Sequence, residues 1–132
     1  DLEKVVYRLI DPEQYAGKKV LVVGGGDSAL EAAARLAEQP GTQVTLSYRG
    51  SAFSRARAKN RDRAAALVAD GRIVQLLNSA IVTIDPGSVT VEQAGQTRLI
   101  ENDIVVVCAG GLLPTQFLHD MGVMVETKFG TV

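Results

Sequence analysis

Three consecutive glycines, Gly24, Gly25 and Gly26, separate an apolar run from an alanine-rich stretch and constrain the fold more than any other feature. The preceding run, KKVLVVG at residues 18–24, is typical of a buried strand. The stretch that follows, DSALEAAARLAEQ at residues 27–39, is rich in helix formers and stops at Pro40 and Gly41. With a second strand, QVTLSYR at residues 43–49, these segments predict one βαβ unit, about 30 residues long as such units tend to be.

The rest of the chain continues this alternation and then changes period. Residues 1–17 are expected to be irregular. The other predicted elements are a helix at residues 60–70 that ends before Gly71, a strand at 72–77, an antiparallel meander of AIVTID, SVTVEQ and TRLIE, a central parallel strand at 103–110, and a short helix between Thr115 and Gly122. This order predicts an α/β fold of the three-layer, Rossmann-like kind. Its central parallel sheet would carry helices on one face and a small antiparallel meander on the other.

The glycine turn contains the pattern G-x-G-x-x-A at Gly24, Gly26 and Ala29. Alone the pattern is weak, but here it follows a predicted strand and opens a predicted helix, as a dinucleotide-binding turn does. Gly24 would permit the tight turn, Gly26 a close approach of pyrophosphate to the backbone, and Ala29 the packing of helix on sheet. The helix N-terminus would offer free N–H groups to the phosphates.

Two polar residues complete the predicted pyrophosphate site. Asp27 is unexpected there, because a carboxylate repels phosphate; we expect it to cap the helix by accepting from N–H groups of the first turn. Ser28 either does similar work or donates to a phosphate oxygen.

The second strand indicates which nicotinamide cofactor is bound. NAD sites usually end this strand with Asp or Glu, which binds the ribose 2′-OH, but here it ends Ser47-Tyr48-Arg49. Arg49 is placed to bind a 2′-phosphate, which favours NADP(H). Arg55 is the best second donor and Arg57 a weaker third, and the choice between them stays open. Tyr48 either stacks on the adenine or packs against the fold.

The end of the later apolar strand is a further candidate contact with the cofactor. Ala109, Gly110 and Gly111 close this strand near the crevice in which α/β sheets bind ligands. Small residues there would allow the cofactor to approach closely. No catalytic residue and no metal ligand set is predicted.

VLVVGGGDSALEAA followed by QVTLSYRGSAF resembles the NADPH-binding domain of thioredoxin-reductase-like flavoproteins, which are FAD-dependent pyridine nucleotide-disulfide oxidoreductases. DIVVVCAGGLLPT resembles a later segment of the same domain, so the resemblance extends from Gly17 to about Val125. It implies a domain that is inserted between two halves of an FAD domain. On this reading residues 1–17 are a linker from the FAD domain, 18–125 the NADPH-binding domain, and 126–132 the start of the return.

Two departures from the family pattern narrow the resemblance. Gly50 stands where the family has a second arginine, and no CxxC precedes the glycine strand. The chain therefore looks closer to the relatives without CxxC, which resemble bacillithiol-disulfide reductases or ferredoxin–NADP reductases. Because it begins with Asp1 and carries no FAD-domain motif, we expect a piece of a longer polypeptide that is inactive alone.

Composition excludes several other functions. The net charge of -1 gives no argument for nucleic acid, and no apolar run is long enough to span a membrane. The single cysteine, Cys108, cannot form an internal disulfide and is expected to be a small buried hydrophobe. His119 alone cannot build a metal site and is expected at the surface. We expect a cytoplasmic protein.

Two hypotheses about function follow. The first is an NADPH-binding domain that presents nicotinamide to FAD held by the rest of the polypeptide, with a homodimer possible through the full-length protein. The second is a nucleotide-sensing or interaction module that keeps the fold but transfers no hydride. The substitution of Gly50 for an arginine gives the second some weight.

Overall fold

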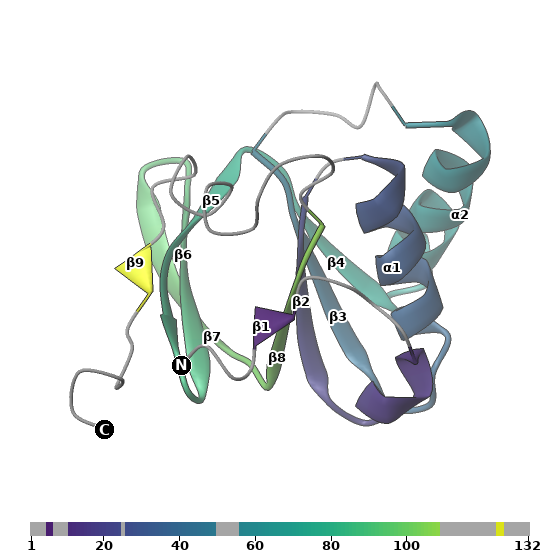
Figure 1. Ribbon diagram of the computed structural model, residues 1–132. Coiled ribbons are helices and arrows are strands. Elements are labelled where there is room, and N and C mark those ends of the chain that lie inside the picture. Colours follow the sequence, from purple (N-terminus) through teal and green to yellow (C-terminus); the bar gives the residue numbers. More distant parts are fainter. Residues whose placement is uncertain (1–4, 7–10, 25, 50–55, 109–123, 126–132) are drawn as a thin grey trace.

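The computed structural model describes residues 5–6, 11–24, 26–49, 56–108 and 124–125. In this part of the chain, the elements form three layers: two α-helices, a five-stranded sheet and a four-stranded sheet. Figure 1 shows the helices on one side of the larger sheet and the smaller sheet on the other. The predicted three-layer, Rossmann-like α/β class is therefore confirmed.

The larger sheet is entirely parallel among the described strands. Its spatial order is β1 (Val5–Val6), β8 (Ile104–Val107), β2 (Lys19–Val23), β3 (Gln43–Ser47) and β4 (Ile73–Leu76). Strand β8 and residues 20–23 of β2 are continuous apolar runs because both faces of these strands are covered, as in other parallel sheets. The predicted central position of β8 is confirmed.

The helix layer packs on one face of this sheet. It consists of α1 (Asp27–Ala37) and α2 (Ala58–Ala69), and a short 3-10 helix at Pro12–Tyr15 lies against α1. Val20 and Val22 of β2 belong to the same buried cluster as Ala33 and Leu36 of α1. The alanines keep the side chains of α1 short where it meets the sheet.

The second sheet covers the opposite face. Its order is β7 (Gln96–Glu101), β6 (Ser88–Gln93), β5 (Ser79–Asp85) and β9 (Met124–Val125). Strands β5, β6 and β7 form the predicted antiparallel meander, while β9 pairs parallel with β5. Side chains alternate along a strand, so Leu21 and Val23 of β2 face this sheet and share a second buried cluster with Ile84 and Val89.

The structure differs from the sequence expectations at both ends of the chain. Residues 1–17 were expected to be irregular, yet Val5–Val6 form β1 beside β8, and Pro12–Tyr15 form a 3-10 helix. Elements this short show no hydrophobic period, and β9 was missed for the same reason. Helix α2 begins at Ala58, two residues earlier than expected. The helix predicted between Thr115 and Gly122, with His119, lies outside the described residues.

Candidate functional site

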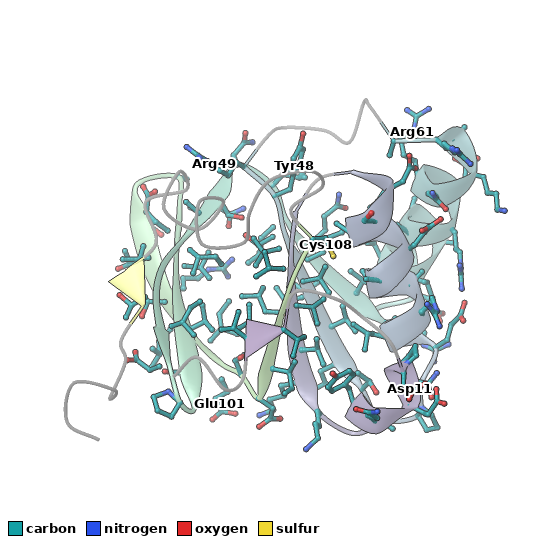
Figure 2. The ribbon with its side chains drawn as sticks, in the orientation of Figure 1. Asp11, Tyr48, Arg49, Arg61, Glu101 and Cys108 are labelled. Atoms are coloured by element: carbon teal, nitrogen blue, oxygen red, sulfur yellow. The ribbon has the colours of Figure 1, made fainter. Side chains whose placement is uncertain are left out.

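The carboxyl ends of three parallel strands meet at one edge of the larger sheet. Val23 pairs with Ser47 on β3 and with Val107 on β8, so the next residues in each strand, among them Gly24 and Tyr48, share this edge. Figure 2 shows Tyr48 and Arg49 at this edge, while Glu101 of β7, in the smaller sheet, lies at the opposite end of the view. Ligands of open α/β sheets bind outside the carboxyl ends of the strands.

Gly24 occupies the point where β2 turns into the helix layer. Its φ of +147° lies in a region that L side chains rarely adopt. A Cβ at this position would lie 2.6 Å from the carbonyl oxygen of Cys108 and 3.2 Å from the Cβ of Ala29. Ala29 is itself fully buried. The predicted structural tasks of Gly24, a tight turn, and of Ala29, packing of the helix on the sheet, are therefore both visible.

Gly26 is the N-cap residue of α1 and is exposed. A Cβ at Gly26 would meet nothing within 4 Å, so space is open above the turn. Ser28 is also exposed, in the first turn of α1. The first N–H groups of a helix have no acceptor within the helix, and here they start beside this open space. The turn can therefore present backbone donors to an anion, with the positive end of the helix dipole behind them.

Asp27 was expected to cap its own helix, α1, but the structure shows different hydrogen-bond partners. Its Oδ1 accepts a hydrogen bond from the backbone N–H of Arg57 at 2.8 Å and another from Nδ2 of Asn60 at 2.7 Å. The Asn60 hydrogen bond, followed by that of Arg57, lowers the pKa of the Asp27 carboxyl below its ordinary value. The carboxylate is thus drawn to α2 because two donors converge there.

The end of β3 is fixed by buried hydroxyl groups. Ser79 Oγ donates to the carbonyl oxygen of Leu76 at 2.7 Å, and Ser47 Oγ lies 2.7 Å from Ser79 Oγ. Because Ser79 has one hydroxyl hydrogen, Ser47 is the donor in the second bond. The backbone of Tyr48 also bonds to Leu76 and Ser79, at 3.0 Å each. These bonds determine where the chain leaves β3.

Tyr48 and Arg49 are placed differently by this arrangement. Tyr48 is half-buried and packs against the cluster between the sheet and the helices. Arg49 follows it and is exposed at the edge where the glycine turn lies (Figure 2). The structure therefore brings Arg49 to the same edge as Gly24, Gly26 and Ser28.

Five other predicted site residues lie outside the described residues: Gly25, Arg55, Ala109, Gly110 and Gly111. Cys108, just before the last three, is half-buried. It packs against the buried cluster between the larger sheet and the helices, which we call the helix-side cluster. This agrees with its expected role as a small hydrophobe. Burial raises the pKa of its thiol to about 11.

Sequence reasoning missed Asn60 and Ser79, which hold Asp27 and the end of β3. Both are polar residues with less than a tenth of their surface exposed, at 5% and 2%. No local pattern marks their links to the site, because Asp27 lies 33 residues from Asn60 and Ser47 lies 32 residues from Ser79.

A parallel sheet with helices on one face and a small antiparallel sheet on the other defines a Rossmann-like domain, and Gly24 and Gly26 lie at the carboxyl edge of its parallel sheet. The chain belongs to the pyridine nucleotide-disulphide oxidoreductase family, whose family model matches residues 1–131. Bacilliredoxin reductase Bdr from Bacillus subtilis is 32% identical over 133 residues, which cover 98% of this chain and 40% of that protein. A ferredoxin–NADP reductase from Ignicoccus hospitalis is 33% identical over 135 residues, covering 97% and 42%.

Solved structures show the same likeness. The bacillithiol disulfide reductase Bdr from Bacillus cereus superimposes with a TM-score of 0.81 at 28% identity, over 97% of this chain and 40% of that one. A thioredoxin reductase from Streptococcus pyogenes gives a TM-score of 0.70 at 27% identity, over 81% and 36%. The chain thus spans about 40% of the length of the curated relatives it matches. Among the described residues, no helix has the length and apolar character needed to cross a bilayer.

Proposed function

We propose that this chain is the NADPH-binding domain of an FAD-dependent oxidoreductase and presents the nicotinamide for hydride transfer to flavin. The observation that carries the proposal is the placement of an exposed arginine, Arg49, at the same sheet edge as an open glycine turn. The family includes reductases, such as the ferredoxin–NADP reductase of Ignicoccus hospitalis, whose names state an NADP-linked reaction.

The glycine turn would hold the pyrophosphate. Gly24 takes the chain off β2, and Gly26 leaves the space above the turn open because no side chain stands there. The exposed Ser28 and the first N–H groups of α1 would supply donors to the pyrophosphate, and Gly25 belongs to the same turn in the sequence. This part of the site would bind NADH and NADPH alike, because both carry the pyrophosphate.

Arg49 would distinguish the two cofactors. A 2′-phosphate offers oxygens to the two-pronged guanidinium, whereas the 2′-OH of NADH is best bound by a carboxylate. The residues that end β3 and follow it, Ser47, Tyr48 and Arg49, include no acid. The half-buried Tyr48 would set one wall of the adenosine site. Arg55, Ala109, Gly110 and Gly111 remain proposed contacts of the cofactor from the sequence alone.

The reaction would belong to the bound cofactors: NADPH supplies a hydride and FAD accepts it. This chain would bind and orient the nicotinamide, and the flavin would be held outside it. The chain has one cysteine, so it supplies no pair of thiols for disulfide chemistry. We therefore propose that it transfers no hydride without a flavin-binding partner, which we take to be part of the same polypeptide.

Calorimetric titration with NADPH and NADH tests this function. The chain should prefer NADPH, and Arg49→Ala should weaken NADPH binding by roughly 10- to 100-fold, the range for losing a hydrogen bond to a charged group. NADH binding should stay nearly unchanged. Arg72→Ala is the matched control, because it removes one exposed arginine next to the amino end of β4, at the opposite sheet edge. Equal affinities for both nucleotides, unaffected by Arg49→Ala, would contradict the proposal.

A further inference from the structure

Asp27 connects the two helices at the edge where the glycine turn lies. It is the first residue of α1, and its Oδ1 accepts from the backbone N–H of Arg57 at 2.8 Å and from Nδ2 of Asn60 at 2.7 Å. Asn60 is buried, with 5% of its surface exposed, so its amide needs a partner inside the protein. The contact joins residues 30 and 33 positions apart in the sequence.

The contact determines where α2 begins. Arg57 is the N-cap residue of α2, with extended backbone angles, φ -65° and ψ 145°. In a capping box, the side chain three residues further along the same helix accepts the N–H of the N-cap residue. Asn60 occupies that position, but the acceptor is Asp27 of α1. The start of α2 is therefore fixed relative to the glycine turn, and not only by the sequence of α2 itself.

This arrangement has two consequences for an anion at the turn. It engages the Asp27 carboxylate with donors of α2, which reduces its repulsion of a phosphate. It also holds the backbone of Arg57 beside the start of α1, while the Arg57 side chain is exposed. The arginine charge contributes to the lowered pKa of Asp27, after the hydrogen bonds from Asn60 and Arg57. In Figure 2, Arg61, one turn further along α2, lies toward the same edge as Arg49.

We propose that Asp27 is a positioning residue that holds Arg57 beside the glycine turn, so that Arg57 acts as a second cation for the 2′-phosphate. The inference rests on the proposed NADPH-binding function. Asp27 itself would not touch the 2′-phosphate; it would act through Arg57. Together with Arg49 at the end of β3, Arg57 would provide the two positive charges that a phosphate of charge near −2 favours. Asp27 would thus set the preference for NADPH over NADH.

The test is calorimetric titration of NADPH and NADH with Asp27→Ala, Asp27→Asn and Arg57→Ala. Asp27→Ala and Arg57→Ala should each weaken NADPH binding by about 10-fold and leave NADH binding within about two-fold, as expected for one charged hydrogen bond. Asp27→Asn should keep most of the preference, because an amide oxygen can accept the same two hydrogen bonds. This rescue would separate positioning from the negative charge of Asp27.

Glu38→Ala is the matched control. Glu38 follows α1 and forms an ion pair with Arg63 of α2 at 2.5 Å, so it also links the two helices but lies at the other end of α1. It should leave the ratio of the two affinities unchanged. If Asp27→Ala does not fold, as judged by circular dichroism, Asn60→Ala removes one of the two donors from the other side and should also lower the preference for NADPH.

Three results would overturn the inference. If Asp27→Ala lost equal affinity for NADPH and NADH, Asp27 would act on pyrophosphate binding or on folding and not on the 2′-phosphate. An unchanged preference in Asp27→Ala, with the preference lost in Arg49→Ala, would overturn the inference and leave the proposed function standing. A wild-type chain that does not prefer NADPH would overturn both.

Discussion

Gly24 and Cys108 approach each other so closely that residue 24 can have no side chain. A Cβ at Gly24 would lie 2.6 Å from the Cys108 carbonyl oxygen, which belongs to backbone and cannot rotate away. The backbones are tied together here as well, because the N–H of Cys108 donates to the carbonyl oxygen of Val23 at 2.9 Å. The glycine turn is thus built into the end of the sheet and is not a loose connection above it.

Gly24→Ala should therefore destabilise the fold strongly. The substitution combines an unfavourable φ with a clash against fixed backbone, so we expect a loss of at least about 2 kcal/mol in the free energy of unfolding. Urea unfolding followed by circular dichroism measures this loss. An unchanged unfolding midpoint would show that the turn can move away from Cys108.

Gly26→Ala is the matched comparison within the same turn. No atom lies within 4 Å of the added methyl group, so the stability cost should stay below about 1 kcal/mol, the usual cost of alanine in place of glycine at an N-cap. The methyl group would, however, occupy the space proposed for the pyrophosphate. NADH and NADPH should therefore lose affinity together, unlike the selective loss expected for Arg49→Ala. Unchanged affinities would exclude this space as the pyrophosphate site.

Local sequence patterns predict the main helices and strands because each of these elements is long enough to show its own hydrophobic pattern. The apolar run before Gly24 predicts β2, and the alanine-rich stretch after Gly26 predicts α1, which packs those alanines against the sheet. The alternation in the meander predicts β5, β6 and β7 for the same reason. The two-residue strand β1 has no pattern of its own and exists because β8 offers it a partner.

The sequence predicts the parts of the candidate site whose residue type and position at a strand end indicate a role. Gly24 and Arg49 stand at the ends of predicted strands, so their shared edge follows from the parallel order. Asp27 lies in the first turn of α1, as predicted, but its hydrogen-bond partners belong to α2 and not to α1. The prediction failed here because helix capping is a local rule and Asn60 is a distant donor. Sequence spacing does not show whether a carboxylate accepts hydrogen bonds from the first turn of its own helix or from donors on another helix.

Ser79→Ala should weaken the end of β3. The two buried hydroxyls form a chain from Ser47 through Ser79 to the Leu76 carbonyl, and removing the middle member leaves the Ser47 hydroxyl without its acceptor. A buried polar group left unpaired costs about 1–3 kcal/mol. Urea unfolding measures this cost. The double variant Ser47→Ala/Ser79→Ala should be less destabilised than the sum of the single variants, because no orphaned hydroxyl remains. Strict additivity would mean that the two hydroxyls do not depend on each other.

Because Cys108 is largely buried, we predict that the stability of the fold depends on pH in the alkaline range. Burial raises the pKa of its thiol from 9.0 to about 11, because the thiolate loses hydration beside the helix-side cluster. Between these pH values the unfolded chain releases this proton while the folded chain keeps it. The folded state then binds more protons, so the free energy of unfolding falls as the pH rises from about 9 to about 11.

Cys108→Ala should remove this contribution. Urea unfolding of the wild type and of Cys108→Ala at pH 8 and pH 10 measures the contribution of the thiol to the free energy of unfolding. The other titrating groups are the same in both proteins, so their contributions cancel when the two pH dependences are subtracted. Wild type should lose more stability than the variant over this interval. A chemical measurement gives an independent check: since the thiolate is the reactive form, iodoacetamide at pH 8 should alkylate folded Cys108 far more slowly than the thiol of the urea-unfolded chain. Equal alkylation rates, together with equal pH slopes, would show that the thiol ionises as freely in the folded protein as in the unfolded one.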